Sequence, residues 1–187
     1  MKYTHLTKIL LILTLLFSTI QSYSQARGGI GIGLGYNLPL SNNDYNIGGG
    51  GFIQGSIALN NKWAIVPRLG VENLDGNGRA VYDQYGYVSR HINNLGLIYI
   101  GVSAKYFFRQ HFFAEAGPTL FVGAGGDGVD AGGISASGAA GYNLKLDRHS
   151  SLEFSLNTSV IYIDSSNGTV PIVSAKLAYA FNFKGKD

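Results

Sequence analysis

Residues 152–160 read LEFSLNTSV and alternate strictly between two kinds of side chain. The even positions are Leu, Phe, Leu, Thr and Val, and the odd positions are Glu, Ser, Asn and Ser. Because successive side chains of an extended strand point to opposite faces, this period of two predicts a β-strand with one apolar and one polar face. Beyond residue 24 no segment has a sustained 3.6-residue apolar period, so the sequence predicts an all-β fold.

Seven further stretches have the same period of two. Each is about as long as the 9–11 residues that a tilted membrane-spanning strand needs. The eight predicted strands are Gly28–Asn37, Gly50–Leu59, Trp63–Asn73, Gly96–Phe108, Phe112–Val122, Gly133–Leu146, Leu152–Ile163 and Val170–Lys184.

The connections between these strands alternate in length. The short ones are residues 60–62, 109–111 and 147–151, and the long ones are 38–49, 74–95, 123–132 and 164–169. Short turns at one end and long loops at the other are typical of outer-membrane β-barrels. The sequence therefore predicts an eight-stranded antiparallel up-and-down transmembrane barrel, in which the last strand returns beside the first.

The apolar faces of the strands are expected to point outward, into lipid. They end in aromatic residues near the short turns, as rings do at a lipid interface. These rings are Trp63, Tyr106, Phe108, Phe112, Phe154, Phe181 and Phe183. The polar faces are rich in Gly, Ala and Ser with few charges, which suits a narrow lumen better than a surface in water.

Every glutamate of the chain falls on a polar face, together with four basic residues. This predicted lumen charge network consists of Arg68, Glu72, Lys105, Glu115, Lys145, Glu153 and Lys176. Since the interior of an eight-stranded barrel is just wide enough for side chains, we expect these groups to pair and to fill it. The barrel should then be closed to solutes.

Two hairpin registers follow from requiring cross-strand partners to share a face. Phe108 opposite Phe112 places Lys105 opposite Glu115, and Leu146 opposite Leu152 places Lys145 opposite Glu153. Pro67 and Pro118 lie within strands, where each removes a ladder hydrogen bond, so we expect local bulges there.

Composition supports a membrane-associated β-protein. Only 13% of residues are charged, against about 25% in a typical soluble domain. There are 27 glycines and no cysteine, which excludes disulfides and thiolate metal sites. The net charge of +3 includes Lys2 and Lys8. The chain lacks a stripe of basic residues that would indicate a nucleic-acid partner.

The first 24 residues resemble a secretory signal peptide. A basic start is followed by the apolar run Ile9–Phe17 and by Ser22-Tyr23-Ser24, so cleavage is expected before Gln25. The run is too short for a membrane-spanning helix, although an uncleaved anchor is the alternative. The predicted organisation is residues 1–24 as leader and 25–187 as the barrel domain.

The mature chain resembles the small outer-membrane β-barrel family common in Bacteroidota, which includes PorT-like proteins, and the OmpA- and OmpX-like eight-stranded barrels. The resemblance rests on Ser24-Gln25 at the end of the leader, the opening strand GGIGIGLG at residues 28–35 and the final strand LAYAFNF at residues 177–183. It implies an outer-membrane location and insertion by the barrel-insertion machinery, which reads a C-terminal aromatic strand. Here residues 184–187 follow that strand, and the resemblance transfers no catalytic residue.

Candidate chemistry is sparse. The glycine pattern at residues 123–128 matches GxGxxG, but no helical pattern follows it, so a loop is expected. Ser89 and His91, with Asp83 nearby, could form a nucleophile and base only if folding brought them within hydrogen-bond reach. Asp127 and Asp130 are too few carboxylates for a calcium site. No cofactor or metal is therefore predicted.

Three functions remain open. The first is a non-enzymatic outer-membrane barrel that contacts lipid and presents the loop at residues 74–95, with Tyr82, Tyr85, Tyr87, Arg79 and Arg90, to an extracellular or envelope partner. The second is a lipid-modifying barrel enzyme with a site at the outer rim. The third is a soluble secreted barrel that binds an apolar ligand.

Overall fold

The computed structural model describes residues 28–40, 44–82, 84–109, 111–125, 130–162 and 169–183. They form ten strands: β1 Gly29–Pro39, β2 Tyr45–Ala58, β3 Trp63–Gly76, β4 Ala80–Tyr82, β5 Val88–His91, β6 Leu95–Phe107, β7 Phe112–Gly125, β8 Asp130–Lys145, β9 Ser150–Tyr162 and β10 Thr169–Asn182. Within these ranges no helix is long and apolar enough to cross a membrane. The expected signal peptide lies outside the described residues.

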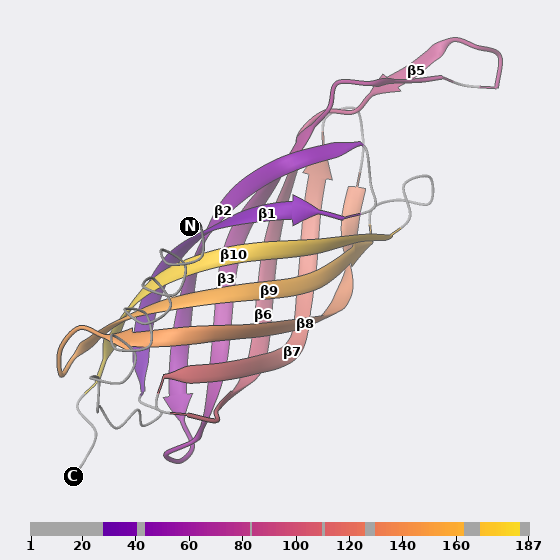
Figure 1. Ribbon diagram of the computed structural model, residues 1–187. Coiled ribbons are helices and arrows are strands. Elements are labelled where there is room, and N and C mark those ends of the chain that lie inside the picture. Colours follow the sequence, from indigo (N-terminus) through magenta and orange to yellow (C-terminus); the bar gives the residue numbers. More distant parts are fainter. Residues whose placement is uncertain are drawn as a thin grey trace, which may run out of the picture.

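Eight of the strands close into an antiparallel barrel in the order β1-β10-β9-β8-β7-β6-β3-β2 (Figure 1). Strands β1 and β10 pair from Gly29↔Asn182 to Pro39↔Ile172, which closes the barrel. The predicted eight-stranded fold is thus confirmed. Every pair of adjacent barrel strands follows directly in the chain or joins its two ends, apart from β3 and β6, between which β4 and β5 are inserted.

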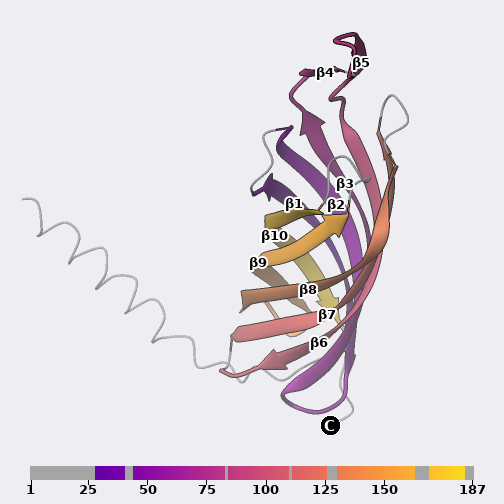
Figure 2. The ribbon, with the colours of Figure 1, turned by 90° about the vertical axis from the view of Figure 1, so that its right-hand side faces the viewer.

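The turn residues between β3 and β6 predict an irregular loop, but the structure has a β-hairpin there. Strands β4 and β5 pair antiparallel and project beyond the rim of the barrel (Figure 2). The base of this hairpin is fixed by Gly78 N–H donating to Ile92 C=O at 2.9 Å and Ile92 N–H donating to Arg79 C=O at 2.9 Å. Backbone pairing therefore continues above the barrel wall.

The faces of the strands are as the alternation predicts. On β9, Leu156 is 64% exposed on the outside, whereas Glu153 is 9% exposed and points into the lumen. The same contrast holds on β6, where Ile98 is 59% exposed and Leu97 is 1% exposed. The outer surface of the barrel is apolar, and Glu72, Lys105, Glu115 and Glu153 are buried inside.

Aromatic rings gather near the turns at residues 59–62, 108–111 and 146–149, which we call the short-turn end. The rings of Trp63 and Tyr106 lie 4.7 Å apart, and Phe112 lies 6.2 Å from Phe108 and 5.1 Å from Tyr142. These rings come from β3, β6, β7 and β8 and the adjoining turn. They form part of the predicted aromatic belt.

The two prolines interrupt the ladder without a bulge, so the expected bulges are wrong. Next to Pro118, pairing between β6 and β7 stops after Gly101↔Thr119 and resumes at Ala104↔Ala116 in the same register. Next to Pro67, pairing between β2 and β3 is likewise missing and resumes in register. The barrel loses ladder contacts at each proline but accommodates no extra residue.

The register predicted for the β6–β7 hairpin is confirmed. Phe107 pairs with Phe113 and Lys105 pairs with Glu115, which places Phe108 opposite Phe112. The amide of Phe108 donates to the Phe112 carbonyl at 3.2 Å and closes the turn.

The register predicted for the β8–β9 hairpin is wrong by two residues, because the turn is tighter than expected. Lys145 pairs with Ser151, and Asn143 takes the place opposite Glu153. The Asp147 carboxylate accepts hydrogen bonds from His149 N–H at 2.6 Å and from Ser150 N–H at 2.8 Å. These bonds hold residues 147–149 in a compact turn, and β9 begins at Ser150 directly after it.

Candidate functional site

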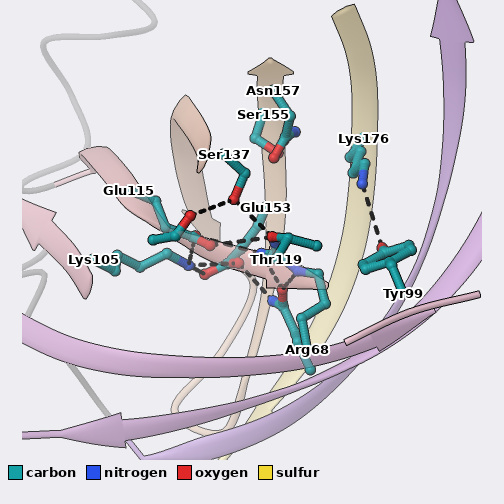
Figure 3. Close-up of polar contacts among 12 residues, drawn as sticks. Arg68, Tyr99, Lys105, Glu115, Thr119, Ser137, Glu153, Ser155, Asn157 and Lys176 are labelled. Atoms are coloured by element: carbon teal, nitrogen blue, oxygen red, sulfur yellow. Dashed lines mark hydrogen bonds and ion pairs between the residues drawn. The ribbon is translucent and has the colours of Figure 1, made fainter. Parts of the chain in front are cut away.

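The lumen of the barrel holds the charged residues that the sequence singled out, and Glu153 is the centre of their contacts. Its carboxylate accepts hydrogen bonds from Lys105 Nζ at 2.9 Å to each oxygen, from Gln54 Nε2 at 2.8 Å and from Asn143 Nδ2 at 2.9 Å. These donors come from β6, β2 and β8, so one carboxylate on β9 ties together strands from around the barrel (Figure 3).

Arg68 links this centre to a second carboxylate. Its guanidinium lies 3.1 Å from Glu115 Oε1 and donates to Gln54 Oε1 at 2.8 and 3.2 Å. Lys105 lies directly opposite Glu115 in the ladder, yet its Nζ is 3.9 Å from that carboxylate and 2.9 Å from Glu153. The stronger partner of Lys105 is therefore a residue across the lumen and not its neighbour in the hairpin.

A second ion pair lies nearer the long loops. Lys176 Nζ is 2.8 Å from Glu72 and donates to the Tyr99 hydroxyl oxygen at 3.3 Å. The same ammonium lies 4.9 Å from the centre of the Tyr99 ring, within the range of a cation–π contact. Tyr99 was not among the residues that the sequence singled out.

These side chains form a balanced charge layer: three bases, Arg68, Lys105 and Lys176, face three acids, Glu72, Glu115 and Glu153. All six have side chains that are at most 13% exposed. A buried ion is costly unless it is paired and hydrogen-bonded, and each of these has such a partner. Lys145, the seventh predicted member, lies beside Glu153, Asn143 and Ser151 around a cavity at the short-turn end.

Neutral amides complete the network, and sequence reasoning missed them. Gln54 donates to Glu153 and accepts from Arg68, so it bridges the two ion pairs. Asn143 lies opposite Glu153, where the predicted register has Lys145. Both fall on inward-facing positions, and a search for every polar inward residue, rather than charged ones alone, would have found them.

A layer of apolar side chains closes the lumen at the long-loop end. This apolar layer contains Tyr45, Phe52, Leu74, Ile92, Leu95, Leu97, Tyr99, Phe121, Ile161, Val170, Ile172 and Ala178. Leu74, Leu95, Val170 and Ile172 are fully buried. The expectation that charged groups alone fill the barrel is therefore incomplete. The one available signal was residues 95–100, LGLIYI, which are apolar on both faces of the strand.

The space left in the lumen is small. Two cavities of about 30 Å³ each lie within it, one at the short-turn end and one between the charge layer and β8–β10. A cavity needs roughly 10–15 Å³ of such space to hold one water, so each admits a water or two and no metabolite.

Of the candidate enzymatic residues, His91 is the one whose side chain lies in the described part of the chain. The ring Nδ1 of His91 lies 3.3 Å from the Gly78 carbonyl oxygen, a contact within the base of the β4–β5 hairpin. Asp83 and the side chain of Ser89 lie outside the described part of the chain. Among the residues that the structure describes, no group of three or more His, Cys, Asp or Glu is placed to hold a metal ion.

The β4–β5 hairpin exposes the tyrosines that had been assigned to partner contact. Tyr82, Tyr85 and Tyr87 are each more than 60% exposed. At the base of the hairpin, Arg79 forms an ion pair with Asp44 at 2.9 Å. The side chain of Arg90 lies outside the described residues.

The fold is that of small outer-membrane β-barrels. The structure is similar to Neisserial surface protein A (TM-score 0.57, 15% identity, 83% of this chain and 97% of that one) and to OprG from Pseudomonas aeruginosa (TM-score 0.56, 8% identity, 86% and 98%). It is also similar to the attachment invasion locus protein Ail of Yersinia pestis (TM-score 0.50, 13% identity, 85% and 99%). No protein-family model and no curated protein sequence matches the chain.

Proposed function

We propose that this protein is a non-enzymatic integral outer-membrane barrel with a filled lumen, whose rigid wall presents the β4–β5 hairpin to the cell exterior. The observation that carries the proposal is the inside-out distribution of polarity. Every glutamate of the barrel is buried in the lumen, while large apolar side chains such as Leu34, Ile98 and Leu156 are exposed. In water this surface would be unfavourable, and in a bilayer it is the stable arrangement.

A soluble secreted barrel is disfavoured by the same distribution. Such a barrel would keep its apolar side chains inside and would need a cavity for a ligand. Here the two lumen cavities measure only about 30 Å³ each. A lipid-modifying enzyme would need a nucleophile and a base together, and the His91 ring contacts a backbone carbonyl instead.

The proposal includes the route to the membrane. Residues 1–24 direct export and are removed, and the final aromatic strand, β10, is read by the barrel-insertion machinery. Because outer-membrane barrels have short periplasmic turns and longer extracellular loops, the proposal has the short turns in the periplasm and the β4–β5 hairpin outside. The sequence pattern favours a relationship to the small outer-membrane β-barrels of Bacteroidota that include PorT-like proteins.

Fractionation of cells that express the full chain tests the location. We expect the mature protein in the outer membrane, resistant to salt washing and soluble only in detergent. Recovery from the salt-washed soluble periplasm would overturn the proposal.

Protease treatment of intact cells tests the orientation. Trypsin should cut at Arg79 or Arg90 in the hairpin and spare Lys62 and Arg148 in the short turns. In cells with a permeabilised outer membrane, the short turns should become accessible as well. Cleavage at the short turns of intact cells would show that the barrel is oriented the other way.

The partner role of the hairpin has its own test. Replacing Tyr82, Tyr85 and Tyr87 with Ser should leave folding and insertion unchanged, because these rings are exposed and make no contribution to the barrel interior. Cross-linking from this hairpin on intact cells should give a discrete adduct that the triple variant loses. The absence of any adduct with the native hairpin would leave the barrel without the proposed partner role.

A further inference from the structure

The wall of the barrel has a seam between β8 and β9. Their ladder runs from Lys145↔Ser151 up to Gly138↔Thr158 and then stops. Above this point, β8 residues 134–137 pair only with β7, and the β9 residues 159–162 that face them pair only with β10. Over this stretch, two adjacent strands of a closed barrel face each other without ladder pairing, whereas the wall elsewhere is broken only beside the prolines and at the irregularity between Asn46 and Gly49 of β2.

One side chain bridges the seam. Val160 N–H donates to Ser135 Oγ at 3.1 Å, and that hydroxyl donates to the carbonyl of Ala136 at 3.1 Å. The outward residues beside the seam are apolar: Ile134 is 81% exposed, Tyr162 49% and Val160 46%. The proposed membrane placement therefore puts the seam at the level of hydrocarbon, where backbone groups without partners are costly.

A cavity of the lumen reaches the wall where the ladder stops. Ser137, Gly138, Thr158 and Ser159 form this side of a space of about 30 Å³. Ser137 Oγ lies 2.9 Å from Thr119 Oγ1 and donates to the Gly117 carbonyl at 3.0 Å (Figure 3). The lining also includes the ion pairs Arg68–Glu115 and Lys176–Glu72, whose charges balance.

The size and chemistry of this cavity define what it could take. A space of about 30 Å³ of this kind holds one or two water-sized groups, so it admits a hydroxyl group but no larger headgroup. Hydroxyl oxygens and backbone groups can both donate to and accept from such a group. A charged headgroup would disturb ion pairs that are already neutral overall, and burying it would be costly.

The outer surface beside the lower end of the seam carries short side chains. Ala114, Ala116, Ala136 and Ala140 face outward around Gly138. Across β7 and β8, Ala114 pairs with Ala140, Ala116 with Gly138 and Ala136 with Pro118. Longer residues flank them, with Phe112 and Tyr142 below and Leu120 and Ile134 above. A hydrocarbon chain can approach the barrel backbone more closely here than over the flanking residues.

We propose that the seam is a lateral binding site for a neutral single-chain amphiphile with a headgroup no larger than a hydroxyl. Its hydroxyl occupies the cavity at Ser137 and Ser159 and supplies a partner for the polar groups of the open edges. Its hydrocarbon chain leaves through the seam and lies along the outer face of β7 and β8. The inference goes beyond the proposed function, and it rests on the membrane placement given there.

Photolabelling in phosphatidylcholine vesicles tests the site. The probes are hexadecanol with a diazirine near its hydroxyl end and a hexadecane with the diazirine at the same carbon. We expect the alcohol to label residues 132–138 and 158–162 about tenfold more than other outward stretches, a preference of about 1.4 kcal/mol. Excess unlabelled hexadecanol should suppress this labelling, and the alkane should show no such preference.

Cysteine pairs test whether the open seam is required. The native chain has no cysteine, so the introduced thiols are the only ones. A disulfide in Ala136→Cys/Val160→Cys would close the seam, whereas one in Ala140→Cys/Leu156→Cys joins residues that are already paired. Oxidation should abolish the alcohol preference in the first variant and leave it intact in the second. Preference that persists in the closed barrel would overturn the proposal.

A serine pair keeps the test decisive if the disulfide does not form. Ser137→Ala should reduce alcohol labelling severalfold, and Ser155→Ala, in the paired half of β9, should leave it unchanged. Equal labelling around the whole barrel by both probes would overturn the seam site while supporting membrane placement. The absence of labelling on any outward face would instead contradict the proposed function.

Discussion

At the scale of single residues, Glu153 shows how the lumen is stabilised. Three side chains from three strands donate to its carboxylate, and its strongest partner, Lys105, has a side chain that is only 2% exposed. Removing one member of a buried ion pair leaves the other charge without compensation, which typically costs about 3–5 kcal/mol. Loss of a carboxylate from this buried layer should therefore lower the free energy of unfolding more than loss of a carboxylate on the surface.

We therefore expect Glu153→Gln to lower the free energy of unfolding by about 3–5 kcal/mol, measured by urea titration of the protein in lipid vesicles. The glutamine keeps the size of the side chain but leaves the Lys105 ammonium unpaired at this position. Ser155→Ala on the same strand is the control and should change stability by less than about 1 kcal/mol. Equal stability of Glu153→Gln and the control would contradict the central role of this carboxylate.

Asp147 sets the turn between β8 and β9, outside the wall of the barrel. Hydrogen bonds from the Ser150 hydroxyl and from the amides of His149 and Ser150 hold the pKa of this carboxyl below its usual value. Since the folded pKa is lowered, the stabilising effect is present above the unfolded pKa of about 3.9 and is lost as the pH falls through the folded value.

In an NMR titration, the amide shifts of His149 and Ser150 should move together at a pH below that of an ordinary aspartate. Asp147→Asn should remove this transition while leaving the barrel folded. A transition of these amides at or above pH ~4 would show that the hydrogen bonds do not act on the carboxyl as described.

At the scale of structural elements, two layers could seal the lumen, and they differ in chemistry. The apolar layer draws Leu74 from β3, Leu95 and Leu97 from β6 and Ile172 from β10. The charge layer lies below it and adjoins both cavities. Water can hydrogen-bond within a charge layer, but it finds no partner among packed leucines.

The apolar layer is therefore expected to be the barrier to water. Vesicles containing the native protein should show the water permeability of empty vesicles in stopped-flow light scattering. Leu97→Ser/Ile172→Ser should raise it severalfold, whereas Lys105→Met/Glu153→Met, which replaces a charge pair with apolar side chains of similar size, should not. Leakage through the second variant alone would assign the seal to the charge layer.

At the scale of the whole molecule, the barrel is closed in two senses. The ladder of the wall closes between β1 and β10 and is interrupted at the prolines, at the seam and between Asn46 and Gly49, and each of the two lumen cavities measures about 30 Å³. An eight-stranded barrel has an interior just wide enough for its own side chains. Transport of hydrated solutes along the axis is not compatible with this packing.

Reconstitution in a planar bilayer should therefore give no steady large-conductance channel. Folding of the protein used for reconstitution can be verified on gels, where a barrel unfolded by heating migrates more slowly than the folded form. A stable current of the size that porins carry would refute the closed lumen.

Periodicity determined which residues share a face, because a strand alternates sides at each residue, and the aromatic residues and the sparse charge of the polar faces indicated which face meets lipid. It also determined the β6–β7 register, where Phe108 and Phe112 share a face across a tight turn. These features are local, so no knowledge of distant strands was needed.

Tertiary structure decided the rest, because closure brings strands together across the lumen that are far apart in the chain. Lys105 lies closer to Glu153, 48 residues away in the chain, than to its ladder neighbour Glu115. Gln54 donates a hydrogen bond to Glu153, which is 99 residues away. The turn that the Asp147 carboxylate stabilises gives a β8–β9 register that differs by two residues from the predicted one. The end of the β8–β9 ladder at Gly138↔Thr158 is likewise a feature of the closed wall and was not predicted from the sequence.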